Sequence, residues 1–149
     1  MNMTPSDGLF SVTFESGFAA ITIGNHINRF CCCKEDEETL SHMVDVIAHS
    51  NGIYGTDMID LERIFERCSS HRFLICPSRR LGAEVTPVAQ GGSKAAILFI
   101  MGGSDMGLSD VDRIIGETVK CYPAETEILF TAENSGKIPA GFYTICVLE

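Results

Sequence analysis

The strongest structural signal in this sequence is the stretch AAILFIMGGSDMGLSDV, which spans Ala95–Val111. Its apolar run from Ala95 to Met101 is typical of a strand in the middle of a sheet that is covered on both faces. Gly102-Gly103 ends the strand, and Ser109, with Asp112 three residues later, is placed to cap a following helix. The apolar side chains of that helix recur at helical spacing, at Val111, Ile114, Ile115 and Val119.

Shorter patterns on both sides extend this unit. β-prone runs at Phe73–Cys76, Glu127–Ala132 and Phe142–Leu148 predict three more strands. Upstream, the carboxylates of residues 35–38 precede an amphipathic helix, where they complement the helix dipole; its apolar positions are Leu40, Met43, Val44 and Ile47. Breaks at Asn51-Gly52 and Gly55 separate it from a second short helix with Leu61, Ile64, Phe65 and Cys68 on one face. Leu81–Ser93 predicts a loop.

The N-terminal part has a pattern of its own. Leu9–Glu15 and Phe18–Gly24, joined by Ser16-Gly17, predict a β-hairpin, whereas Asn25–Lys34 has no clear pattern. The predicted fold is therefore an α/β two-layer sandwich with a mainly four-stranded sheet and two packed helices, plus an N-terminal β-hairpin and helix. We expect residues 1–149 to form a single domain, with the hairpin as an extension over about residues 1–34.

Composition excludes several classes of protein. The 149 residues are 45% hydrophobic, enough to bury a core, and the formal net charge of −9 argues against nucleic acid or an anionic membrane as the main partner. The N-terminus lacks the basic flank and apolar centre of a signal peptide, and no apolar run is long enough to span a bilayer, so we expect a cytoplasmic location. Seven scattered cysteines without a CxxC pair predict reduced thiols; adjacent Cys31-Cys32-Cys33 is a weak candidate cluster, and no metal or cofactor is expected.

Two glycine-rich segments are candidates for phosphate binding. Neither Gln90–Lys94 nor Met101–Gly107 has the GxxxxGK[ST] or GxGxxG pattern. The second lies between a strand and a helix, but Asp105 and Asp110 would repel a phosphate there, which favours a structural turn. His26, Arg79, Arg80 and Asp105 are the other polar candidates, and no motif unites them.

The segment Thr56–Ile64 places Asp57 and Asp60 at the start of a helix. Free backbone N–H groups stabilise carboxylates in this position, so capping accounts for at least one of them. Both could also be presented to a neighbouring molecule, because loops carry function more often than cores do.

In order along the chain, these residues resemble the C-terminal half of FtsZ, the bacterial and archaeal relative of tubulin. Ala95–Val111 is similar to the family's apolar strand, Gly-Gly-x-Asp-Leu turn and following helix, and Glu127–Phe130 and Tyr143–Val147 fall where the family has its last two strands. Asp36–Phe65 resembles the end of the family's long central helix and the loop after it.

The resemblance implies a role and also a loss. Ile59-Asp60-Leu61 matches the Val-Asp-Phe part of the family's Asn-Val-Asp-Phe-Ala-Asp loop, which completes the nucleotide site of the next subunit. Here Met58 replaces the Asn and Arg63 the last Asp, so only Asp60 carries over. The family's Gly-Gly-Gly-Thr-Gly-x-Gly signature for GTP is missing from this sequence, and autonomous GTPase activity is therefore not expected.

Three hypotheses follow. The first is a non-enzymatic assembly or regulatory protein, an isolated FtsZ C-terminal-like domain that binds itself or a tubulin-like GTPase filament through Asp57, Asp60 and Arg63. The second is a small-molecule-binding protein or enzyme with its site between subunits of an oligomer. The third is a degenerate paralogue that keeps the fold without the activity.

Overall fold

A five-stranded sheet occupies the second half of the chain. In the computed structural model, which describes residues 10–49, 58–85 and 93–149, β6 (Ala95–Gly102) lies at its centre. The order is β4-β8-β6-β7, in which β7 (Glu127–Asn134) is parallel to β6 and β8 (Phe142–Leu148) is antiparallel to it. The short strands β4 (Phe73–Ile75) and β5 (Arg79–Arg80) both pair with β8.

The two faces of β6 belong to two different hydrophobic clusters. All eight residues of β6 are buried, as the unbroken apolar run predicts. Ile97 and Phe99 point into a cluster with the helices before β6, whereas Leu98 and Ile100 point into a cluster with α4 (Leu108–Val119). The strand therefore has no polar face because it is covered on both sides.

The N-terminal segment forms a sheet of three strands where a hairpin was predicted. β1 (Phe10–Glu15) and β2 (Phe18–Ile23) pair antiparallel, and Gly17, with φ of +80°, suits the tight turn between them. β3 (His26–Cys31) adds a third strand in the region that had no clear pattern. Its sequence HINRFC conceals the strand because Phe30 is its only fully buried side chain.

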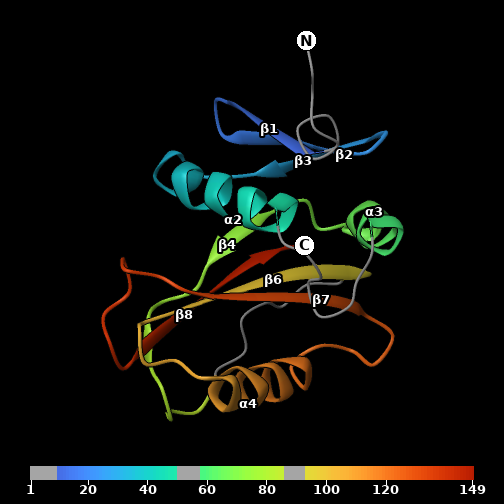
Figure 1. Ribbon diagram of the computed structural model, residues 1–149. Helices are drawn as coiled ribbons and strands as arrows, with labels where there is room; N and C mark the ends of the chain where they lie inside the picture. The colour runs from blue at the N-terminus through green and yellow to red at the C-terminus, as the bar shows by residue number, and fades with distance from the viewer. Residues whose placement is uncertain (1–9, 50–57, 86–92) are drawn as a thin grey trace.

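Four layers replace the two that the sequence predicted. Figure 1 shows the three-stranded sheet, then α2 (Glu37–His49) and α3 (Met58–Arg67), then the five-stranded sheet, and finally α4 on the opposite face. A one-turn helix, η1 (Lys34–Asp36), leads into α2. The additional layers arise because α2 packs against both sheets. Its buried side chains belong to one cluster with residues of the two sheets, and they are Leu40, Met43, Val44 and Ile47. The mixed α/β class is confirmed.

One local prediction about α4 is wrong. Gly107, and not Ser109, is the residue that precedes the helix, and the Asp110 carboxylate accepts the backbone N–H of Gly107 at 2.9 Å. Asp110 thus satisfies a free N–H at the helix start. None of the described helices is long and apolar enough to cross a membrane.

Some predictions fall outside the described residues. These are the chain breaks at Asn51-Gly52 and Gly55, the predicted site residue Asp57, most of the glycine-rich segment Gln90–Lys94, and the second half of the Leu81–Ser93 loop.

Candidate functional site

Helix α3 is held between the two sheets, and it carries two of the three predicted partner-binding residues, Asp60 and Arg63. Its buried side chains Leu61, Ile64 and Phe65 face the shared core, as the spacing predicts. The neighbouring positions on its two flanks carry opposite charges: Glu62 and Glu66 on one, and Arg63 and Arg67 on the other. Each pair reaches a different sheet, so α3 connects them by charge as well as by packing.

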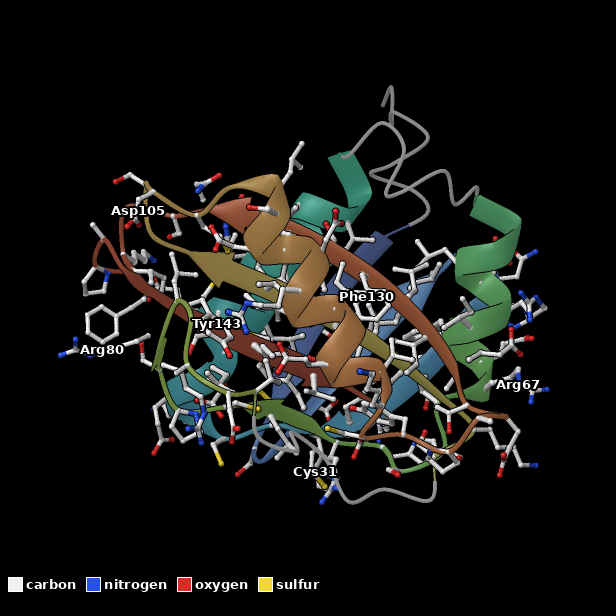
Figure 2. All side chains as sticks on the ribbon, turned by 90° about the horizontal axis from the view of Figure 1, so that it is seen from below. Cys31, Arg67, Arg80, Asp105, Phe130 and Tyr143 are labelled. Carbon is white, nitrogen blue, oxygen red and sulfur yellow. The ribbon has the colours of Figure 1, made fainter. Side chains whose placement is uncertain are left out.

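The basic flank of α3 meets the start of β7. Arg67 Nε lies 2.8 Å from Glu127 Oε1, and the Arg63 guanidinium contacts Glu127 Oε2. Both arginines are about half exposed, and Figure 2 shows Arg67 at the rim of the molecule beside α3. Ion pairs so accessible to water add little to stability. Their main consequence is a charged surface that another molecule can contact.

The acidic flank of α3 meets β3. His26 Nδ1 lies 2.5 Å from Glu66 Oε1, and His26 Nε2 lies 3.7 Å from Glu62 Oε2. Gly24, with φ of +60°, leaves room for the Glu62 carboxylate, which a Cβ at this position would force to move. His26, one of the loose polar candidates, therefore joins the two sheets through α3.

The predicted partner-binding residues are only partly visible. Arg63 is exposed on α3 and contacts Glu127, and the backbone of Asp60 lies in the first turn of α3. Asp57 lies outside the described residues. Sequence reasoning missed Arg67 and Glu127. Arg67 could have been found, because its four-residue spacing from Arg63 places the two arginines on one face of the helix.

The Gly-Gly turn after β6 is a structural junction. The Asn134 side-chain amide donates to the carbonyl oxygens of Gly103 and Met106 at 2.7 and 2.9 Å, and Asp105 accepts the Gly141 N–H at 2.7 Å. A Cβ on Gly103 would come within 2.4 Å of the Pro139 carbonyl oxygen. The geometry favours the structural turn over an anion site, because the polar groups of the turn are used to hold neighbouring loops together.

Gly103→Ala is expected to lower the free energy of unfolding by about 2 kcal/mol, because the new methyl group meets rigid backbone rather than a movable side chain. Urea unfolding followed by circular dichroism measures the change. Gly136→Ala is the matched control, since a Cβ there meets nothing within 4 Å. An alanine at Gly103 that leaves stability at the wild-type value would contradict this close packing.

Arg79, Arg80 and Asp105 do not form a common polar site in the described part of the chain. Arg79 and Arg80 make up β5, and the Arg80 guanidinium lies 5.7 Å from the Phe142 ring centroid. Figure 2 shows Arg80 and Asp105 at the same end of the sheet, whereas His26 belongs to β3 of the other sheet. Arg80, Asp105 and His26 each make a separate structural contact, and Arg79 pairs with Tyr143 of β8 in the sheet.

A cleft of about 310 Å³ opens between α2 and the end of β7. The His42 imidazole contacts the Glu133 carboxylate in it, and Lys137 Nζ, also from its lining, lies 2.8 Å from Glu38 Oε1. An imidazole–carboxylate pair can transfer a proton. Thr39, which carries a hydroxyl group, lines the same cleft. The sequence could not indicate this pair, because His42 and Glu133 lie 91 residues apart.

The cysteine cluster is split between the surface and the core. Cys31 and Cys33 are exposed and Cys32 is buried. Burial, with a smaller effect from the Asp36 and Glu37 carboxylates, raises the pKa of the Cys32 thiol to about 11, so it stays protonated at neutral pH. Across residues 10–49, 58–85 and 93–149, no three or more His, Cys, Asp or Glu side chains are grouped to hold a metal ion.

Comparison with known proteins gives a likeness of fold. No family model and no curated protein sequence matches the chain. Among solved structures, an empty FtsZ dimer from M. jannaschii matches 77% of this chain and 38% of its own, with TM-score 0.55 and 14% identity. A mutant FtsZ from M. jannaschii matches 77% of this chain and 39% of its own, with TM-score 0.50 and 12% identity. This chain therefore spans about two-fifths of the length of those FtsZ chains and shares the fold of that part.

Proposed function

We propose that this protein is a non-catalytic assembly or regulatory domain that binds itself or a tubulin-like GTPase filament. The likeness of its fold to part of FtsZ is the observation that carries the proposal. These 149 residues contain no glycine-rich GTP signature, so the proposal assigns assembly to them and not nucleotide hydrolysis. A single-domain, cytoplasmic protein would fit this role.

In this proposal the contact with the GTPase is made by Asp60 and Arg63, in the N-terminal half of α3, together with Asp57, which precedes α3 in the sequence. Arg63 is exposed, and its guanidinium lies beside Glu127 and near Arg67, so this part of α3 presents both signs of charge. Such a surface steers an encounter with a partner of complementary charge. Asp60 is the one residue that matches the corresponding loop of the FtsZ family.

Co-sedimentation with the tubulin-like GTPase of the same organism tests the proposal. The wild-type chain is expected to enter the pellet with GTP-dependent polymers, and Arg63→Glu is expected to weaken that binding by at least about tenfold, because it reverses a charge at the contact. Asp60→Ala is expected to weaken it as well. Lys120→Glu at the end of α4 changes the charge by the same amount on the opposite side of the sheet and is the control.

Absence of the wild-type chain from the pellet, with no effect on the amount of polymer, would reject this binding. Loss of binding in Lys120→Glu equal to that in Arg63→Glu would show that net charge, and not the α3 surface, governs the interaction.

The small-molecule alternative has one specific observation in its favour, the cleft that His42 and Glu133 line. Its four sequence candidates, His26, Arg79, Arg80 and Asp105, do not line that cleft. A polar site completed by a second subunit would favour this alternative, and absence of both ligand and partner would favour a degenerate paralogue.

A further inference from the structure

The outermost strand of the main sheet, β7, has one free edge. The strand is eight residues long, and within the described part of the chain it pairs only with β6. A long edge strand exposes a row of backbone donors and acceptors that can pair with another chain. The other end of the sheet differs, because β4 and β5 are short there.

The hydrogen bonds at both ends of β7 show which backbone groups point outward. Glu127 N–H donates to Lys94 O at 3.0 Å, and Ser135 N–H donates to Gly102 O at 2.7 Å. The backbone N–H and C=O of a strand residue point to the same side, and the side alternates along the strand. The odd-numbered residues between these two therefore face β6, and Ile128, Phe130, Ala132 and Asn134 direct their backbone groups away from it.

The side chains at the first three of these positions are apolar and only partly buried. Ile128, Phe130 and Ala132 pack against the cluster that includes the buried side of α4. Figure 2 shows Phe130 beside α4 on that face of the sheet. An added strand would therefore find both unpaired backbone groups and apolar side chains to cover.

We infer that a second copy of this chain adds to this edge, pairing β7 antiparallel with β7 of the partner subunit about a two-fold axis at Phe130. This register places Phe130 opposite Phe130 of the partner subunit, and Ile128 opposite Ala132 of the partner subunit. Ile128, Phe130 and Ala132 of each copy then form backbone hydrogen-bonded pairs, and the main sheet continues through both subunits.

Charge complementarity on the other face of the strand favours a second copy as the occupant. The same register brings Glu133 of the partner subunit opposite Glu127, where carboxylates alone would repel. Two guanidinium groups, those of Arg63 and Arg67, already lie on Glu127, so the arriving carboxylate meets positive charge. The two-fold axis repeats the arrangement at the other end of the interface.

This inference deepens the proposed function, since it assigns a surface to the self-association that the proposal includes. The dimer and the filament binding can be tested separately. The main test variant for the dimer, Ala132→Pro, changes no residue of the proposed α3 contact with the GTPase. A chain that stays monomeric but still co-sediments with polymers rejects the edge and leaves the filament binding in place.

The experiment measures mass and amide exchange of the full chain across a concentration range of about 1 to 300 µM. Analytical ultracentrifugation is expected to show a shift from the 16.2 kDa monomer to twice that mass. In the dimer, the amides of Ile128, Phe130 and Ala132 gain protection from hydrogen exchange, whereas those of Leu129 and Thr131 are protected at every concentration.

Ala132→Pro removes one outward N–H without removing a bond to β6, and it is expected to weaken dimerisation by at least about tenfold. Ala132→Ser keeps that N–H and is the control, and circular dichroism verifies that both variants fold. Should the proline variant not fold, Arg67→Glu serves instead: it adds repulsion between the copies, and Glu133→Arg in the same chain is expected to restore dimerisation.

A monomer throughout the concentration range would overturn the inference. A dimer that Ala132→Pro leaves intact, with no added protection at Ile128, Phe130 and Ala132, would place the interface elsewhere and would overturn it equally. Failure of Glu133→Arg to rescue Arg67→Glu would reject the register centred on Phe130.

Discussion

Phe99→Ala is expected to lower the free energy of unfolding by about 3 to 5 kcal/mol. Phe99 is fully buried on β6, and its ring centroid lies 6.0 Å from that of His42 on α2. Its cluster contains residues of both sheets and of α2 and α3. The cavity that the substitution creates therefore lies in the core that joins the two sheets and the two helices. Without the ring, the favourable free energy of burying it is lost, and a space remains that the surrounding strands cannot fill.

Urea unfolding followed by circular dichroism measures this effect, and we expect one cooperative transition because the cluster joins the two sheets. Phe99→Leu keeps most of the volume and is expected to lose less than about 2 kcal/mol. Phe18→Ala, at the first residue of β2, is a second control for loss of an aromatic ring, because the Phe18 side chain is about half exposed. Separate transitions for the two sheets would contradict a single folding unit.

Arg72→Met is expected to destabilise the fold by about 3 kcal/mol or more. Arg72 Nε lies 2.7 Å from Oε1 of Glu149, whose side chain is fully buried. Oε2 of the same carboxylate has no hydrogen-bond partner in the described structure. Without the guanidinium, a buried negative charge is left unpaired, which costs more than the ion pair itself contributes.

The double variant Arg72→Met/Glu149→Leu separates these two contributions. It is expected to recover most of the lost stability, since it removes the buried charge together with its partner. Lys137→Met breaks an ion pair of similar geometry, but both its side chains are largely exposed, and it is expected to leave stability nearly unchanged. Equal losses in Arg72→Met and the double variant would show that the charge of Glu149 is not the cause.

The sequence predicted the main sheet well because its signals are local. A strand buried on both faces needs an unbroken apolar run, and Ala95–Gly102 has one. Residues Glu127–Asn134 and Phe142–Leu148 are β-prone runs with clear ends, and both form strands. The apolar positions of α4 follow helical spacing, although Gly107 rather than Ser109 precedes it.

Strand β3 was missed because non-local contacts stabilise it. Its Asn28 side chain donates to the carbonyl oxygens of Phe65 and Cys68, both at 3.3 Å, at the end of α3. Cys31 N–H donates to His71 O at 2.8 Å, in the segment between α3 and β4. Polar residues in β3 thus have partners about 40 residues away, which no pattern within the strand reveals.

The candidate site divides in the same way. Asp60 and Arg63 were found from a short motif and a helix start, which are features of neighbouring residues. The partner of Arg63 was not found, because Glu127 belongs to a strand 64 residues later. The same holds for His42 and Glu133 in the cleft beside α2.

By itself, the sequence determined the mixed α/β class, the central buried strand and the turn–helix unit that follows it, because hydrophobic spacing and turn residues act over a few positions. Only the tertiary structure decided the four layers, the ion pairs that α3 makes with residues of both sheets and the open edge of β7. These features depend on which elements meet in space, and a helix such as α2 has the same apolar spacing whether one sheet or two cover it.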